Sequence, residues 1–168
     1  GATIGGIFWW YNAPMQKLTR ALDAYDYSAA AQVLPTLSKD ELASVSGQMQ
    51  EYAQTVIDRY NKSEANYDSS YELLDRPQKL FPNIGLDDQL NGIQSLKDSK
   101  EAYKNGKSLQ AQGEDGRAIT EYQKVIHADV NHDDAQTQIQ NIRTAYKEKV
   151  LSDAQSRADE KDFLGAEA

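Results

Sequence analysis

Apolar residues recur every three or four positions along most of the chain, which is the spacing of one face of an α-helix. The longest such stripe lies within residues 39–62. Its members are Leu42, Val45, Met49, Tyr52, Ala53, Val56, Ile57 and Tyr60. Similar stripes occupy 114–128 and 133–158, and no segment alternates polar and apolar residues as a half-buried strand does. The pattern predicts an all-α protein.

Turn signals divide this pattern into about seven helices. We expect helices near 14–24 and 27–37, followed by a long helix that a capping box of Ser38 and Glu41 opens. Proline lacks an amide donor, so Pro77 and Pro82 are expected to end a helix that begins near Tyr67, after a turn at 61–66. The remaining expected elements are a linker at 81–85, a helix at 86–112 closed by Gly113, a helix to Ala128, a turn at 129–134, a long helix, a turn at 159–162 and the start of a helix at 163–168.

Four of these turns share a pattern of an acid or Asn, an aromatic, two further residues and then a small residue. It is complete in Asp26–Ala30, Asn66–Ser70 and Asp162–Ala166, and it lacks the aromatic in Glu114–Ala118. The second residues are 27, 67, 115 and 163, at spacings of 40, 48 and 48. Such periods are typical of stacked helical hairpins, because each hairpin buries its apolar face against the next. We expect two hairpins in 14–80 and further hairpin structure in 86–168.

Residues 102–135 resemble a tetratricopeptide repeat (TPR). Gly106 stands at the small residue of the family's first helix, and Gly113 at the turn between the helices. Ala118 and Tyr122 match the Ala and the aromatic of the second helix, and Asp129-Val130-Asn131 resembles the exit turn Asp-Pro-x-Asn. The chain departs from the family pattern at Ala102, Asn105 and Val130. Leu109 stands where the family has an aromatic residue.

The resemblance implies a right-handed superhelical stack of antiparallel hairpins, a TPR-like α-solenoid. It also implies a non-enzymatic scaffold that binds a protein or peptide in a concave groove. Some relatives grip a carboxyl terminus with basic and Asn side chains, and no such set is placed in this sequence. The final hairpin of 86–168 is expected to be truncated.

The segment 1–13 is apolar and ends in an aromatic cluster. No residue in 2–11 is charged, and Trp9, Trp10 and Tyr11 close the run before Pro14. Ten residues are too few to cross a bilayer, but aromatic rings favour its boundary with water, so the run reads as the remnant of a membrane anchor. Two alternatives stay open: a cap on the first hairpin, or the tail of a signal peptide. The expected location is membrane-anchored and extracytoplasmic, with a cytoplasmic location as the alternative.

The charge balance of −8 argues against nucleic acid as a partner, because such binding needs a basic surface. The absence of cysteine excludes thiolate nucleophiles and Cys-ligated metals. No Gly-x-Ser-x-Gly or phosphate-binding loop occurs, so no catalytic residue, cofactor or metal ligand is assigned. The protein is expected not to be an enzyme.

One cluster invites a metal site: His127, Asp129, His132, Asp133 and Asp134. Histidine and carboxylate suit Zn²⁺ or Ni²⁺, but a separation of five residues puts two histidines on different faces of a helix. The loop resembles a calcium loop only at its start, since Asp134 and Gln140 replace the usual Gly and Glu. We interpret these residues as helix ends whose charges complement the helix dipoles.

Three hypotheses follow. The first is a protein-interaction module, with Tyr67 and Tyr71 packing the hairpin or, if they are exposed, forming a partner-binding patch. The second is a structural spacer or assembly domain that self-associates through 163–168. The third is a metal- or ligand-binding receptor domain that uses 127–134.

Overall fold

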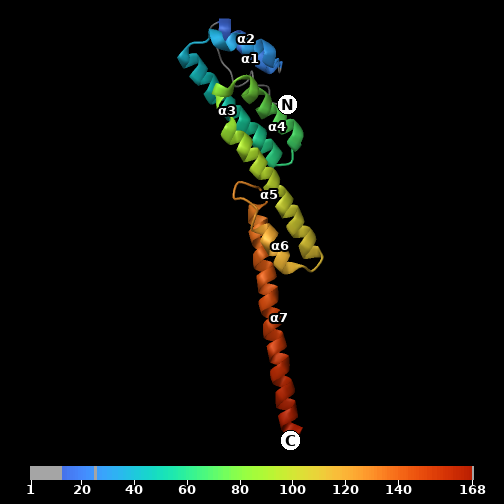
Figure 1. Cartoon of the computed structure of the whole chain (residues 1–168). Helices are drawn as coiled ribbons and strands as arrows, with labels where there is room; N and C mark the ends of the chain where they lie inside the picture. The colour runs from blue at the N-terminus through green and yellow to red at the C-terminus, as the bar shows by residue number, and fades with distance from the viewer. Residues whose placement is uncertain (1–12, 25, 168) are drawn as a thin grey trace. The chain divides into compact units, whose positions relative to one another are not determined.

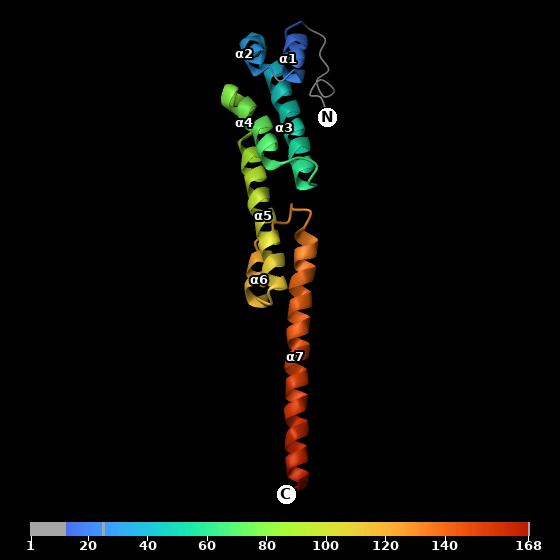
Figure 2. The ribbon, with the colours of Figure 1, turned by 90° about the vertical axis from the view of Figure 1, so that its right-hand side faces the viewer.

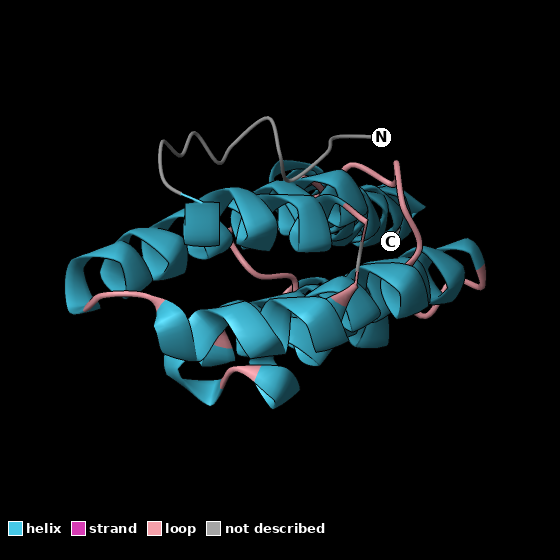
Figure 3. Ribbon diagram, turned by 90° about the horizontal axis from the view of Figure 1, so that it is seen from above, coloured by secondary structure: helices cyan, strands magenta, loops and turns pink. Residues whose placement is uncertain are grey.

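In a computed structural model, residues 13–24 and 26–167 are described, and this part of the chain consists of helices and loops without a strand (Figures 1 and 3). Its α-helices are α1 (Ala13–Asp23), α2 (Tyr27–Val33), α3 (Lys39–Asn61), α4 (Tyr67–Leu80), α5 (Asp87–Ala111), α6 (Asp115–Tyr122) and α7 (His132–Glu167). Two 3₁₀ turns are η2 (Leu34–Thr36) and η3 (Pro82–Ile84). The predicted all-α class and the seven helices are confirmed within these residues.

The chain divides into two compact units, residues 1–97 and residues 98–168. In the first unit, α1 packs on α2 and α3 packs on α4, so neighbours along the chain are neighbours in space (Figure 2). The α3 stripe predicted from the sequence supplies much of its core, with Val45, Met49 and Ala53 fully buried. The Ser38–Glu41 capping box is present as predicted: the Glu41 amide donates to the Ser38 hydroxyl at 3.2 Å, and the Ser38 amide donates to the Glu41 carboxylate at 3.1 Å.

Three of the four repeated turns open helices, as the spacing predicts. They precede α2, α4 and α6, which begin at residues 27, 67 and 115. At the first two turns the acid or amide caps the helix: Asp26 accepts from the Ala29 amide at 3.0 Å, and Asn66 accepts from the Ser69 amide at 2.8 Å. These side chains satisfy amides that have no partner within the helix.

The segment 81–85, predicted as a linker, is a tightly held turn. Phe81 and Ile84 are buried, and Gly85 adopts a left-handed φ of 76°. Gln78 bonds both sides of it, accepting from the Leu86 amide at 2.6 Å and donating to the Pro82 carbonyl at 3.2 Å. Hydrogen bonds therefore hold the chain where η3 leads into α5. The division between the compact units falls within α5.

α4 ends shortly before Pro82, as predicted, whereas Pro77 lies inside the helix and does not end it. The helix runs three residues further, to Leu80, and the Pro77 carbonyl accepts the Phe81 amide at 2.8 Å. A proline removes a single amide donor, and so close to the C-terminus the helix loses little by it. Pro77 is also buried, so its ring packs in the core.

The turn predicted at 159–162 is wrong, because α7 continues through it to Glu167. Residues 157–162 contain neither Gly nor Pro, and the side-chain amide of Gln155 donates to the Asp159 carboxylate at 2.9 Å. An acid followed by an aromatic does not stop a helix without such a breaker. Consequently 163–168 does not open a second helix of a hairpin in the described residues.

The apolar segment assigned as a membrane-anchor remnant lies outside the described residues, except for its last residue, Ala13. Among residues 13–24 and 26–167, none of the helices combines the length and the apolar character that a membrane span requires.

Candidate functional site

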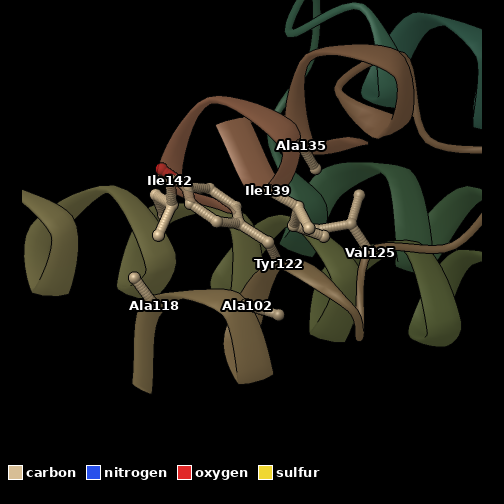
Figure 4. Close-up of a cluster of buried hydrophobic side chains, with 7 residues drawn as sticks. All are labelled: Ala102, Ala118, Tyr122, Val125, Ala135, Ile139 and Ile142. Carbon is tan, nitrogen blue, oxygen red and sulfur yellow. The ribbon is translucent and has the colours of Figure 1, made fainter. Parts of the chain in front are cut away.

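The second unit is centred on a hairpin, α5 against α6, with the start of α7 packed on it. Seven buried apolar residues drawn from these helices and the loop after α6 form one cluster: Ala102, Ala118, Tyr122, Val125, Ala135, Ile139 and Ile142. Figure 4 shows the Tyr122 side chain in the middle of this cluster. Tyr122 and Ala118 are fully buried, so both residues that matched the second helix of a repeat lie in the core.

The ring of Tyr122 lies directly against the backbone of α5 at Gly106. A Cβ atom added to Gly106 would come within 2.8 Å of two ring carbons. No side chain fits there without moving the ring, so Gly106 is required for the close approach of the two helices. The sequence predicted both residues, and the structure brings them together.

The helix predicted to extend to Ala128 ends at Tyr122 instead. Beyond it the chain tightens, because the Lys124 and Val125 amides bond to carbonyls three residues back, at 3.0 and 3.1 Å. This tightening places the Val125 side chain in the core rather than on a continued helix.

A chain of polar side chains surrounds this core. The Tyr122 hydroxyl donates to Gln110 at 2.6 Å, Gln110 donates to Gln138 at 3.2 Å, and Gln138 donates to Asp134 at 3.4 Å. Tyr103 closes the chain by donating to the other oxygen of Asp134. Because Tyr103 and Gln110 belong to α5, these bonds fix the α5–α6 hairpin to α7.

Burial and the hydrogen bond to Asp134 raise the pKa of Tyr103 to about 12. Burial also raises the pKa of Tyr122. Both shifts favour the neutral phenol, which is the form that donates a hydrogen bond.

Asp129 locks the exit turn between α6 and α7. Its side chain is fully buried and accepts from the Ser99 hydroxyl at 2.7 Å, from the Asn131 amide at 2.9 Å and from the Lys100 ammonium at 3.3 Å. The Ser99 hydroxyl in turn accepts from the Ile126 amide at 2.9 Å. The carboxylate is thus surrounded by donors, which offset the cost of burying its charge.

The remaining residues of the suggested metal cluster do not converge. His127 and His132 stack, with ring centroids 4.9 Å apart, while Asp129 points inward and Asp134 bonds to Tyr103. Asp133 is exposed and lies 3.5 Å from His132. In the described ranges, no group of three such side chains is arranged to hold a metal ion.

Ser99, Lys100, Gln110 and Gln138 were not among the residues that the sequence singled out for a role. Ser99 carried a usable signal, because it continues an apolar row on α5 that includes Ile93, Leu96 and Ala102. A polar residue in such a row must find a buried partner. The partner lies 30 residues away, and nothing in the local sequence identifies it.

A groove lies between α6 and the middle of α7. It encloses about 500 Å³ and is lined by Gly116, Ile119, Ile142, Arg143, Tyr146, Lys147 and Val150. Tyr146 remains 70% exposed, although it belongs to the apolar stripe found in the sequence within 133–158. The core ends at Ile142 because α6 is too short to cover the next turn of α7.

In the first unit, Tyr67 is the centre of an aromatic cluster. Its ring centroid lies 5.7 Å from those of Tyr60 and Tyr71, and the Lys97 ammonium sits 4.6 Å from it. Tyr67 and Tyr71 are half-buried, so each residue keeps part of its surface open to solvent.

Comparisons of the chain with protein-family models, with curated proteins and with solved structures found no match. The functional interpretation therefore rests on these local arrangements.

Replacing Gly106 by Ala is expected to destabilise the protein, because the new methyl would collide with the Tyr122 ring. Overpacking of this kind costs about 1–3 kcal/mol, and the better helix propensity of Ala returns about 1 kcal/mol. Gly92→Ala is the matched control in α5, since its Cβ meets nothing within 4 Å, and it should be stabilising. Urea denaturation followed by circular dichroism measures both. An equal cost of Gly106→Ala in a Tyr122→Leu background would show that the ring is not the cause.

Ser99→Ala is expected to cost about 1–3 kcal/mol of folding free energy, because it leaves a buried carboxylate oxygen and the Ile126 amide without a donor and an acceptor. Ser95→Ala, at an exposed position of α5, should change stability little. Chemical denaturation compares the two variants. Equal stabilities would mean that Ser99 does not hold Asp129.

The Tyr103 phenol is expected to ionise near pH 12 rather than near pH 10. Because its pKa is higher in the folded state, its contribution to stability is present below pH 10 and is lost as the pH rises towards 12. The difference in phenolate absorbance between the wild type and Tyr103→Phe isolates this group. Asp134→Asn should lower the midpoint, whereas a Tyr103 midpoint near 10 in the wild type contradicts the burial argument.

Proposed function

We propose that this protein is a non-enzymatic, TPR-like protein–protein interaction module built from stacked helical hairpins. The contact of Tyr122 with Gly106 carries the proposal. Gly106 and Tyr122 stand at the small and the aromatic positions of the repeat that this segment resembles, and the two helices of such a repeat meet through this pair. The packing of α7 on the same hairpin corresponds to the way a following repeat continues the stack.

The regular starts of α2, α4 and α6 support a repeated hairpin plan across both units. We propose that the hairpins follow one another in a right-handed superhelix. Such stacks expose long surfaces without needing a catalytic centre, which agrees with the lack of any nucleophile–base motif in the sequence.

The proposed partner is a protein or peptide that contacts Tyr67 and Tyr71. Tyrosine offers a large rigid ring at low entropic cost, which suits a recognition surface. The packing of Tyr67 on Tyr60 restrains the ring, and Lys97 adds a cation beside it. A partner with an acidic group next to an apolar side chain fits this combination.

For location, we propose a membrane-anchored, extracytoplasmic domain. The argument is the uncharged run at 2–11 with its closing Trp9, Trp10 and Tyr11. The anchor would involve the residues before Pro14.

The double variant Tyr67→Ala/Tyr71→Ala is expected to abolish partner capture while keeping the helical circular dichroism spectrum. The physical reason is the loss of the two rigid rings that the partner contacts. The measurement is crosslinked capture on cells of the source organism, quantified against the wild type. Tyr146→Ala is the matched control, because it removes an exposed tyrosine from the other unit.

A variant that loses helicity would instead assign both tyrosines to the hairpin core. Tyr71→Ala alone then keeps the Tyr60–Tyr67 contact and separates folding from binding. If Tyr146→Ala abolishes capture and the Tyr67/Tyr71 variant does not, the proposed surface is wrong.

A further inference from the structure

From Arg143 onward, α7 presents exposed apolar side chains. Every described side chain from Arg143 to Gly165 is exposed, and Figures 1 and 2 draw neither α5 nor α6 beside the C-terminal end of the helix. Its large apolar residues and their exposed fractions are Tyr146 (70%), Val150 (47%), Leu151 (64%), Phe163 (65%) and Leu164 (64%). A helix gains most of its stability in water by burying an apolar face.

Part of this apolar surface lies along one line. Tyr146 and Leu164 are 18 residues apart, which is five turns of an α-helix, so they point in the same direction. At about 100° per residue, Asp153 and Arg157 lie within about 20° of that line and Val150 within about 40°. The groove between α6 and α7 opens on the same face, because Tyr146 and Val150 are among its lining residues.

Charge is distributed unevenly along the same stretch. Residues 143–149 carry Arg143, Lys147 and Lys149 against Glu148, whereas residues 159–162 carry Asp159, Glu160 and Asp162 against Lys161. The segment is therefore basic at one end and acidic at the other, within a chain whose net charge is −8.

We propose that α7 pairs antiparallel with α7 of a second copy of this chain. Leu164 of each copy enters the groove of the other, between Ile119 and Tyr146. In this register Asp153 of one copy faces Arg157 of the other, Lys149 lies beside Glu160 of the other, and the two-fold axis repeats both pairs. The arrangement is self-complementary, as a two-fold interface requires, and it closes as a dimer.

The apolar residues set the register. The midpoint between Tyr146 and Leu164 is residue 155, so residues that are equally far before and after it face each other across the axis. Asp153 therefore faces Arg157 of the other copy, and the two-fold axis repeats this pair.

A parallel pair is disfavoured by the same charges. It would place the two basic segments side by side and the two acidic segments side by side. Like charges at such contacts repel, so the antiparallel arrangement is selected electrostatically. The pairing involves only the second unit and does not depend on the Tyr67/Tyr71 surface.

Cysteine crosslinking tests the register, because the chain contains no native cysteine. Asp153→Cys and Arg157→Cys should form a mixed disulfide under mild oxidation, because these positions face each other across the axis. Val150→Cys and Glu160→Cys should each stay uncrosslinked alone and form a mixed disulfide when combined. Self-crosslinking of both single variants would indicate parallel pairing and overturn the proposal.

Charge-exchange variants test whether charges drive the association of the two copies. Lys149→Glu/Arg157→Glu makes the contact face of α7 acidic, and Asp153→Lys/Glu160→Lys makes it basic. Each variant alone should dimerise more weakly than the wild type by about tenfold or more, and an equimolar mixture should form a heterodimer. Sedimentation equilibrium of the full chain measures all three samples.

The wild type must sediment as a dimer at concentrations where the charge variants are monomeric. A wild type that stays monomeric throughout, or a mixture that associates no better than its components, overturns the proposal. Circular dichroism spectra of the variants confirm that a loss of association is not a loss of folding.

Discussion

The contact between the Tyr122 ring and the bare backbone at Gly106 sets the spacing of the second unit. An aromatic ring can lie flat against a helix only where the helix lacks a side chain, and Gly106 provides that place. With the ring seated there, Ala118 packs one turn earlier and α7 closes the other side of the core. The polar chain from Tyr122 through Gln110 and Gln138 to Asp134 then follows the surface that this spacing creates.

The charged and polar groups near this core hold the helices and the exit turn in place. Asp129 resembled a metal ligand in the sequence, yet its oxygens are occupied by Ser99, Asn131 and Lys100. The stacked histidines lie outside that network. A buried acid with a full set of donors gives the exit turn one conformation, which is a structural role.

Sequence signals that depend on residues close together in the chain predicted the structure reliably. The α3 stripe, the Ser38–Glu41 box and the Gly113 turn, with its φ of 78°, depend on residues close together in the chain, and the structure contains them all. The environment of Asp129 and the partners of Gln110 depend on residues about 30 positions away, which periodicity does not reveal. The predicted turn at 159–162 is absent for a different reason: the repeated motif there contains no helix breaker. The contact of Gly106 with Tyr122 was the exception among distant pairs, because a family resemblance linked its members.

The hydrogen bonds around Asp129 also affect the direction of α7. Asp129 lies just before the start of this helix, which has 36 residues and is about 54 Å long at 1.5 Å per residue. A tilt of about 10° at this base would move the far end by roughly 9 Å. The hydrogen bonds around Asp129 fix where α7 begins, and the packing of Ile139 and Ile142 with the bonds of Gln138 fixes its direction, so a small rearrangement in this first part of the helix is magnified at its far end.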